Sequence, residues 1–252
     1  MIPIKTSSEI AHMRTACRLS AEVLAQMASR VAPGVTTGEL DAFAAKRMQE
    51  MGIKSAFLGY HGYPGCTCIS LNEEVVHGIP SPNRMINAGD LVSIDVGIEA
   101  DGFIGDNALT VQVGTVDSTA RHLCEVCEKA LQAGIAAATV GAHVSDIGYA
   151  VQSVTEGAGF SVVRDYCGHG VGRALHEEPQ IPNYGKRGHG PLLRAGMTLA
   201  IEPMINAGAS KVEVLENQWT VRTVDRRPSA HFEHTILVTE NGPEILTCAE
   251  KK

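Results

Sequence analysis

The sequence predicts an α/β (α+β) fold built from two helix–helix–strand halves that are related by an approximate two-fold axis. Three observations predict it. A β-hairpin pattern between Leu91 and Asn107 carries one aspartate on each arm, and two pairs of amphipathic helical patterns divide the chain. The third observation is an internal repeat at a spacing of 107 residues. We expect a single domain over residues 1–252, with its repeats at approximately 7–115 and 118–240.

The composition narrows the class of protein. The 252 residues are 44% hydrophobic and 19% charged, which is typical of a soluble globular protein. A formal net charge of -7 argues against general binding to nucleic acid or to anionic membranes. The N-terminus has no signal-peptide core, and no apolar run approaches a membrane span. Seven cysteines without disulfide-scaffold spacing indicate a reducing compartment, so we expect a cytoplasmic protein.

The first helical pair is marked by its start and stop signals. Apolar residues recur at helical spacing over residues 7–31, with Ser7 as the expected N-cap and Pro33-Gly34 as the stop. Thr36-x-x-Glu39 is a capping box that opens a second helix, which we expect to end near Gly52.

A loop-rich segment follows over residues 55–87, in which Cys66 to Leu71 is typical of a strand.

Next comes the hairpin, with apolar alternation from Leu91 to Ile98 and a turn signal at Asp101-Gly102. A loop centred between Ala100 and Asp101 would make Asp95 and Asp106 direct cross-strand partners. A loop centred on Asp101-Gly102 would offset them by about one pairing step. Two carboxylates in half-buried strands repel each other and lose hydration unless a cation or a shared proton compensates. The alternative is an exposed polar face.

The second half repeats this order. A helical pattern begins near Ser118 and a turn falls at Val140-Gly141. A further helix then ends at Gly157-Ala-Gly159. A shift of 107 residues superposes Gly34 on Gly141, and without a gap it lays the segment 87–95 on the segment 194–202.

The repeat duplicates the acidic residues. Glu202 takes the place of Asp95, and Glu233, in a strand expected over residues 230–238, takes the place of Asp106. The segment between these acids in the second half is longer by twenty residues and contains Trp219. Two halves packed about a two-fold axis would bring the four carboxylates together.

Four carboxylates require more than one divalent cation for charge balance. Oxygen ligands favour Mn, Fe, Co or Mg before zinc, and a nitrogen ligand would shift the preference toward a transition metal. The sequence offers His169 in a glycine-rich loop, and also His77 and His176. A single histidine in such a loop is often only a structural hydrogen bonder.

Several motifs together resemble type I methionine aminopeptidase, the bacterial type, of metallopeptidase family M24. They are Gly59-Tyr-His-Gly-Tyr-Pro, His77-Gly-Ile-Pro, Ile94-Asp-Val, Gly105-Asp, Cys167-Gly-His-Gly-Val-Gly, His176-Glu-Glu-Pro, Ile201-Glu-Pro-Met and Phe232-Glu-His-Thr. They follow the order and spacing of the family and span nearly the whole chain. The resemblance implies the pita-bread fold around a dinuclear metal site. It also implies removal of the initiator methionine from nascent polypeptides, preferentially before a small second residue.

The resemblance implies the ligands of two divalent ions, which would be Co, Mn, Fe or Zn. Asp106 and Glu233 would bridge both ions, Asp95 would complete one of them, and His169 with Glu202 the other. A bridging water would lose a proton to the cations and attack the scissile carbonyl as hydroxide. Glu202 would carry a proton from the water to the departing amine.

Two histidines and a slot for methionine complete the site that the resemblance implies. His176 would donate to the oxyanion, and His77 would hold the backbone N–H of the second residue. The slot would be formed by Tyr60, Tyr63, Cys68, Trp219 and His77, which suits a flexible thioether. The alternative for Tyr60 and Tyr63 is a loop packed by its own aromatic residues.

The sequence departs from the usual bacterial pattern at four positions. Phe57 stands where a smaller Cys is common, and Leu175 where Phe is common; both are assigned to the slot. Asn107 replaces a usual Thr or Ser, and His231 a usual Gln. These departures affect the expected pocket shape and the tuning of the metals.

Two rival functions share the fold. Prolidases and aminopeptidase P carry an additional N-terminal domain, and we expect none here. We likewise expect neither the insertion of the type II enzymes nor the zinc-binding extension of the eukaryotic type I enzymes. A non-catalytic module that binds peptides, ribosomes or histones typically loses metal ligands, whereas all five are present. We expect a monomer that acts on nascent N-termini, with the ribosome near the exit tunnel as a candidate partner.

Overall fold

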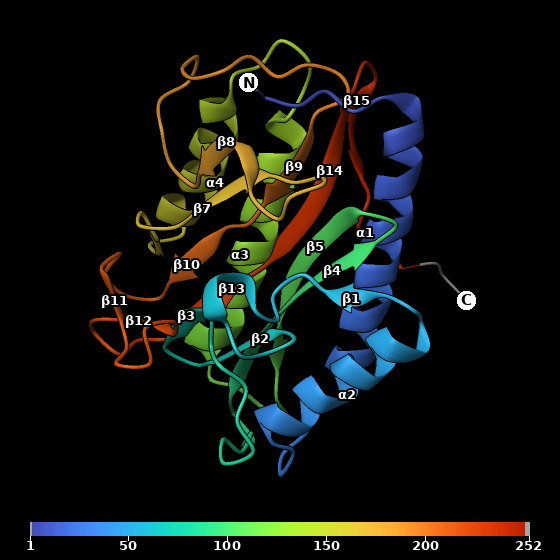
Figure 1. The fold of residues 1–252 in the computed structure, drawn as a ribbon. Helices are drawn as coiled ribbons and strands as arrows, with labels where there is room; N and C mark the ends of the chain where they lie inside the picture. Colours follow the sequence, from blue (N-terminus) through green and yellow to red (C-terminus); the bar gives the residue numbers. More distant parts are fainter. Residues whose placement is uncertain (1, 250–252) are drawn as a thin grey trace.

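The computed structural model describes residues 2–249. Its long helices are α1 (Ser7–Ala28), α2 (Thr37–Glu50), α3 (Ser118–Ala137) and α4 (Val144–Gly157). In the view of Figure 1, α1 and α2 lie toward the right of the strands, and α3 and α4 lie toward the left. Within residues 2–249, no helix is long and apolar enough to cross a membrane.

The strands form one large sheet and two small ones. The large sheet has nine antiparallel strands in the order β1-β4-β5-β14-β9-β7-β8, with β2 beside β4 and β15 beside β14. The small sheets are β13-β10-β6 and β11-β12-β3. The bounds are β1 (Lys54–Ser55), β2 (Cys68–Leu71), β3 (Glu74–Val76), β4 (Leu91–Ala100), β5 (Phe103–Gln112), β6 (Ser161–Val162), β7 (Cys167–Gly170), β8 (Glu177–Pro182), β9 (Thr198–Ile201), β10 (Met204–Asn206), β11 (Val212–Val214), β12 (Val221–Thr223), β13 (Ser229–His231), β14 (Glu233–Thr239) and β15 (Gly242–Ile245). A 3-10 turn, η1, spans Tyr60–Gly62.

The two expected halves are confirmed in detail. Helices α2 and α4 start and end 107 residues apart. Glu39 accepts a hydrogen bond from the backbone N–H of Thr36, and Asp146 accepts one from that of His143 in the same way. The N-cap residues form equivalent isolated bridges, Thr36 with Met85 and His143 with Leu192. The repeat therefore extends to the hydrogen bonds and bridges at the N-termini of α2 and α4.

The first helix begins one residue earlier than expected. Thr6, not Ser7, is the N-cap of α1, because Glu9 stands three residues after Thr6 and completes a capping box with it. The expectation for Ser7 was therefore wrong. The capping box predicted at Thr36 and Glu39 is present at the start of α2.

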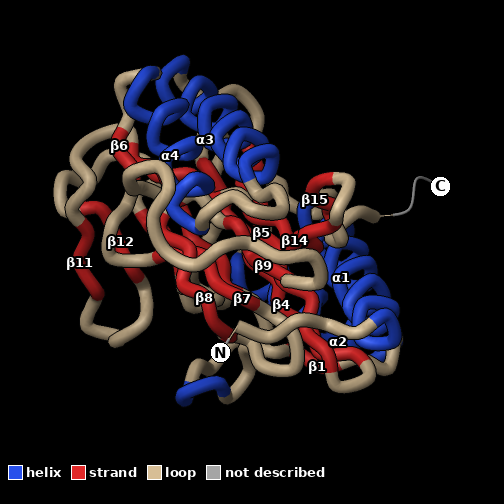
Figure 2. The backbone as a smooth tube through the Cα atoms, turned by 90° about the horizontal axis from the view of Figure 1, so that it is seen from above, coloured by secondary structure: helices blue, strands red, loops and turns tan. Residues whose placement is uncertain are grey.

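The helices cover one face of the large sheet. A Cβ at Gly105 of β5 would lie 2.5 Å from the backbone oxygen of Ala16 in α1. Ile201 of β9 contacts the position of Gly134 in α3. Because neighbouring residues of a strand point to opposite faces, Asp106 and Glu202 point away from the helices. Figure 2 shows α3 and α4 packed together against the strands, with α1 along a different edge.

The hairpin decides between the two registers that the sequence left open. Ala100 pairs with Phe103, so the turn is Asp101-Gly102, and both turn residues have positive φ, as a type I′ turn requires. Asp106 consequently faces Gly97, two residues from Asp95. The aspartates are thus diagonal neighbours on one face of the sheet.

Two expected strands have different limits. The strand expected over residues 230–238 is divided at Phe232 into β13 and β14, which belong to different sheets. The division follows from backbone pairing, because His231 exchanges hydrogen bonds with the Thr110 hydroxyl instead of continuing the ladder of β14.

The strand expected from Cys66 begins at Cys68. The backbone N–H groups of Cys66 and Thr67 donate to the carboxylate of Asp41 in α2, so they are not available for a strand ladder.

Candidate metal centre and substrate pocket

Five adjacent strands of the large sheet each bring one predicted ligand to the face opposite the helices. In the strand order β4, β5, β14, β9 and β7, these side chains are Asp95, Asp106, Glu233, Glu202 and His169. Glu202 follows directly after the last residue of β9. The pseudo-two-fold axis passes between β5 and β14, so it relates Asp95 to Glu202 and Asp106 to Glu233.

The strand registers explain why these side chains share a face. Asp95 and Glu233 both pair with Ala108 of β5, one from each side. His169 pairs with Ala200, which lies two residues before Glu202. Residues that pair directly, or that are two apart in one strand, point to the same face. The cluster therefore depends on the correct register of every strand between β4 and β7.

The distances place a nitrogen donor against the carboxylates. Nε2 of His169 lies 3.4 Å from Oε1 of Glu202 and 3.8 Å from Oδ2 of Asp106. Donor atoms of Asp106, His169 and Glu233 all lie within 4.8 Å of one another. Nδ1 of His169 lies 3.0 Å from the carbonyl oxygen of Gly170 and can only donate to it, which leaves the lone pair of Nε2 for a metal.

The carboxylates lack compensation from the protein. One buried oxygen of each of Asp95, Asp106 and Glu233 has no hydrogen-bond partner. Burial raises the pKa of Asp106 to about 7, and burial with repulsion from neighbouring carboxylates raises the pKa of Asp95, Glu202 and Glu233 well above the usual range. Oxygen-rich donors with one imidazole match the ligand preferences of divalent transition metals. The side chains present therefore fit divalent cations.

A cavity of about 310 Å³ opens next to the carboxylates. Its wall contains all five predicted ligands and every residue predicted for substrate contact, which are Phe57, Tyr60, Tyr63, Cys68, His77, Leu175, His176 and Trp219. The structure thus brings together residues from both halves of the chain.

Aromatic rings pack edge to face along one wall of this cavity. The ring centroid of Trp219 lies 5.0 Å from that of Tyr63 and 6.4 Å from that of His77. The Tyr63 hydroxyl donates to the carbonyl oxygens of Thr67 and Gly78, so the ring cannot swing freely. Burial lowers the pKa of His77 to about 4, which keeps its imidazole neutral near pH 7.

The departures from the usual bacterial pattern occupy different places. Phe57 and Leu175 are both buried and both line the cavity, and the ring of Phe57 lies directly on the backbone of Gly97. Asn107 points to the helix face, where its side chain accepts a hydrogen bond from Ser20. The amide of Asn107 therefore points away from the cluster.

His231, by contrast, adjoins the cluster. It is buried, and its Nε2 lies 3.7 Å from Oε2 of Glu202. The Glu202 carboxylate therefore has an imidazole near each oxygen, His169 on one side and His231 on the other.

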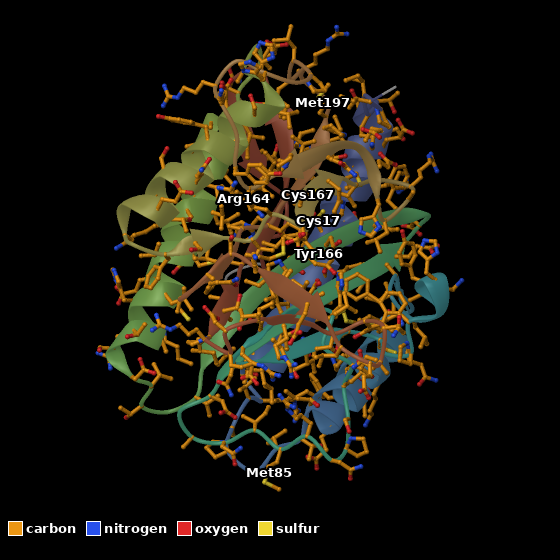
Figure 3. All side chains as sticks on the ribbon, turned by 90° about the vertical axis from the view of Figure 1, so that its left-hand side faces the viewer. Cys17, Met85, Arg164, Tyr166, Cys167 and Met197 are labelled. Atoms are coloured by element: carbon orange, nitrogen blue, oxygen red, sulfur yellow. The ribbon has the colours of Figure 1, made fainter. Side chains whose placement is uncertain are left out.

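Four lining residues were not predicted: Val76, Tyr166, Cys167 and Met204. Tyr166 and Cys167 lie near the middle of the view in Figure 3. The sequence signal that could have identified all four lining residues is their position close to predicted site residues. Cys167 stands two residues before His169, and Met204 two residues after Glu202, so strand alternation points to the same face.

Known proteins share both this sequence and this fold. The model of metallopeptidase family M24 matches residues 11–240. Methionine aminopeptidase 1 of Bacillus subtilis (strain 168) is 47% identical over 98% of this chain and 99% of its own length. The crystal structure of methionine aminopeptidase from Thermotoga maritima has a TM-score of 0.97 and 47% identity, and the match covers 99% of this chain and 100% of that one. The chain belongs to metallopeptidase family M24, whose members bind divalent metal.

Prolidase from Pyrococcus furiosus has the same fold at lower similarity, with a TM-score of 0.78 and 25% identity. This chain covers 66% of the prolidase chain, compared with all of the Thermotoga maritima enzyme. The expected pita-bread fold is confirmed by both structures.

We predict that Glu233→Gln raises the stability of the metal-free protein while removing its response to metal. The amide carries no charge, so repulsion within the carboxylate cluster decreases. The free energy of unfolding of the metal-free variant at pH 7.5 should therefore exceed that of the wild-type protein by on the order of 1 kcal/mol. Mn²⁺ at a concentration of about 100 Kd should increase the free energy of unfolding of the wild-type protein by about 2.7 kcal/mol. It should add much less to the variant. Urea denaturation with and without Mn²⁺ measures both quantities.

Glu177→Gln is the matched control. Glu177 is also a carboxylate with little exposure, but Lys5 lies 2.6 Å away and compensates its charge. This variant should lower the stability of the metal-free protein and keep the response to Mn²⁺. A Glu233→Gln protein that is destabilised without metal and fully stabilised by Mn²⁺ would place the ions elsewhere.

Proposed function

We propose that this chain is a methionine aminopeptidase that removes the initiator methionine from nascent polypeptides, preferentially before a small second residue. The observation that carries the proposal is the position of the carboxylate–imidazole cluster at the wall of an aromatic and sulfur-lined cavity. The high similarity to methionine aminopeptidases over the whole length supports it.

We assign two divalent ions to the cluster, of Co, Mn, Fe or Zn. Asp106 and Glu233, on the two strands beside the pseudo-two-fold axis, would contact both ions. Asp95 would hold one ion, and His169 with Glu202 the other. When bound, such ions polarise a carbonyl and activate water as a nucleophile near neutral pH. The uncompensated oxygens of Asp95, Asp106 and Glu233 support this assignment.

The protein groups around the scissile bond would move and stabilise charge. Glu202, with an imidazole near each oxygen, would accept a proton and return it to the departing amine. His176, at the wall of the cavity, would donate to the carbonyl oxygen as negative charge develops there. His77, kept neutral by burial, would accept the backbone N–H of the second residue.

The cavity favours a single flexible side chain. At about 310 Å³ it lies at the lower end of the range for ligand pockets, so it admits an extended chain end and not a folded surface. Thioether sulfur packs well against aromatic edges, which Tyr63 and Trp219 provide. Phe57 and Leu175 would close the apolar end.

The rival functions are less well supported. A non-catalytic binding module would have no need to hold four carboxylates together, two of them buried and two half-buried, at the cost of their desolvation. Similarity to a prolidase is lower, and it covers only part of that chain.

We further propose that the protein acts in the cytoplasm as a monomer. Its substrates would be nascent N-termini, and the ribosome near the exit tunnel is a candidate partner. Seven free cysteines support a reducing compartment.

The main prediction is metal-dependent release of methionine from Met-Ala-Ser. Chelation with complete loss of bound metal should abolish activity, and Mn²⁺, Co²⁺ or Fe²⁺ should restore it. Glu202→Gln should reduce kcat far more than it changes KM, because it removes a proton carrier and a ligand charge. Methionine release measured with metal analysis is the test. Full activity in protein without metal would refute the proposal.

A second prediction concerns two departures from the usual bacterial pattern in the slot, the larger residue at position 57 and the smaller one at position 175. If Phe57 and Leu175 share the apolar end of the cavity, Phe57→Cys opens a void and weakens transition-state binding of Met-Ala-Ser by about 1–3 kcal/mol. Adding Leu175→Phe should recover most of that loss, because residues that share a cavity couple non-additively. A double-mutant cycle on kcat/KM measures the coupling.

Leu58→Ala is the control for this cycle, since Leu58 is adjacent in sequence but 57% exposed. Its effect should be small and additive with Leu175→Phe. Strict additivity of Phe57→Cys with Leu175→Phe would show that the two positions do not share a pocket.

A further inference from the structure

One contact at the wall of the cavity joins two residues that the proposed function uses separately. The hydroxyl of Tyr60 lies 2.7 Å from Nδ1 of His176, and the ring centroids are 5.3 Å apart. Tyr60 was expected to be a wall of the methionine slot, and His176 a donor to the substrate. The contact links the first half of the chain directly to the second.

The loop that carries Tyr60 is held by its own backbone. Gly59, with φ of 81°, donates its N–H to the carbonyl of Tyr63, and Tyr60 donates its N–H to the carbonyl of Phe57. The hydroxyl of Ser55 accepts from the N–H groups of Phe57 and Leu58. The phenol of Tyr60 is therefore presented from a closed turn.

The same loop is fastened to α2. The hydroxyl of Ser55 also donates to the carbonyl of Cys66. The adjacent Thr67 is held by Asp41 through its N–H and its hydroxyl, each at 2.8 Å.

His176 is held from the other side. Its ring packs edge to face against the ring of His169, with centroids 4.4 Å apart. The next residue, Glu177, receives Lys5 Nζ at 2.6 Å and the backbone N–H of Arg173 at 2.9 Å. The imidazole thus lies between the phenol of Tyr60 and the ring of His169.

A neutral imidazole has one N–H donor and one lone pair, so a partner at one nitrogen determines what the other can do. If the phenol donates to Nδ1, the proton of His176 lies on Nε2. If Nδ1–H donates to the phenol oxygen, Nε2 has only a lone pair. The lone pairs of a phenol are delocalised into its ring, whereas an imidazole nitrogen is a good acceptor, so the first arrangement is favoured.

We propose that Tyr60 is a positioning residue that sets the tautomer of His176. Its hydroxyl donates to Nδ1 and keeps the proton on Nε2, the nitrogen that remains for the substrate. The oxygen of the scissile carbonyl then meets an N–H donor and not a lone pair, and no proton has to move first. This role rests on the proposed function of His176 as a donor to that oxygen.

The direct test is the tautomer itself, which can be measured without substrate. Long-range ¹H–¹⁵N correlation on Zn²⁺-loaded protein labelled with ¹⁵N-histidine reports which ring nitrogen carries the proton. The signals of His176 are assigned by their loss in His176→Gln. In the wild-type protein the proton should lie on Nε2. In Tyr60→Phe the two nitrogen shifts should move toward each other, because the second tautomer becomes populated.

Tyr63→Phe is the matched control. It removes a hydroxyl from the same cavity wall, but that hydroxyl is bonded to the carbonyls of Thr67 and Gly78. The nitrogen shifts of His176 should stay at their wild-type values in this variant.

Kinetics with Met-Ala-Ser then separate positioning from wall packing. Tyr60→Phe keeps the ring, so KM should change less than twofold, while kcat should fall about two- to twelvefold, the factor that one hydrogen bond represents. In a His176→Ala background, Tyr60→Phe should have no further effect on kcat.

A proton on Nδ1 in the wild-type protein, or unchanged shifts in Tyr60→Phe, would overturn the proposal. An equal loss of kcat with and without His176 would also overturn it, because Tyr60 would then act independently. Absence of methionine release with the predicted tautomer intact would instead refute the proposed function and leave the assignment of the proton standing.

Discussion

Four carboxylates on one face of one antiparallel sheet are the constraint on which this molecule is built. They repel one another, and a sheet interior gives them little water, so they can be held together only by a rigid scaffold and by cations. The scaffold is the opposite face, where α1 packs against β5 and α3 against β9. Close backbone approach at Gly105 leaves no room for the strand to shift. The helix layer is therefore what keeps the acids in register.

The duplicated halves contribute different side chains to the site. Each half supplies two acidic residues close to the pseudo-two-fold axis. Beside Asp95 the first half places Cys68 on β2, whereas beside Glu202 the second half brings His169 on β7. The first half also contributes Phe57, Tyr60 and Tyr63.

A symmetric cluster thus acquires an imidazole at one end and an apolar slot at the other. The contact between Tyr60 and His176 joins these two ends, so neither half could hold the site alone.

Much of this could be predicted from the sequence, because local signals agreed with the repeat. The capping box at Thr36 and Glu39, the turn signal at Asp101-Gly102 and the gapless match of 87–95 with 194–202 located the halves and their acids. The error at Ser7 was local, because Glu9 makes Thr6 the N-cap. The errors in strand limits were decided by contacts between distant segments. The strand expected over 230–238 is divided because the backbone N–H and carbonyl of His231 form hydrogen bonds with the Thr110 hydroxyl. The contact of His231 with Glu202 depends on the same division, and periodicity carries no information about it.

The measurement that tests this account most directly is a crystal structure of Mn²⁺-loaded protein with anomalous diffraction at the manganese edge. The account predicts two anomalous peaks inside the cluster. Both should be within ligand distance of Asp106 and Glu233, one near Asp95 and the other near His169. A single peak outside these five side chains, or none at saturating Mn²⁺, would contradict the claim that the carboxylates of the two halves exist to hold a pair of cations.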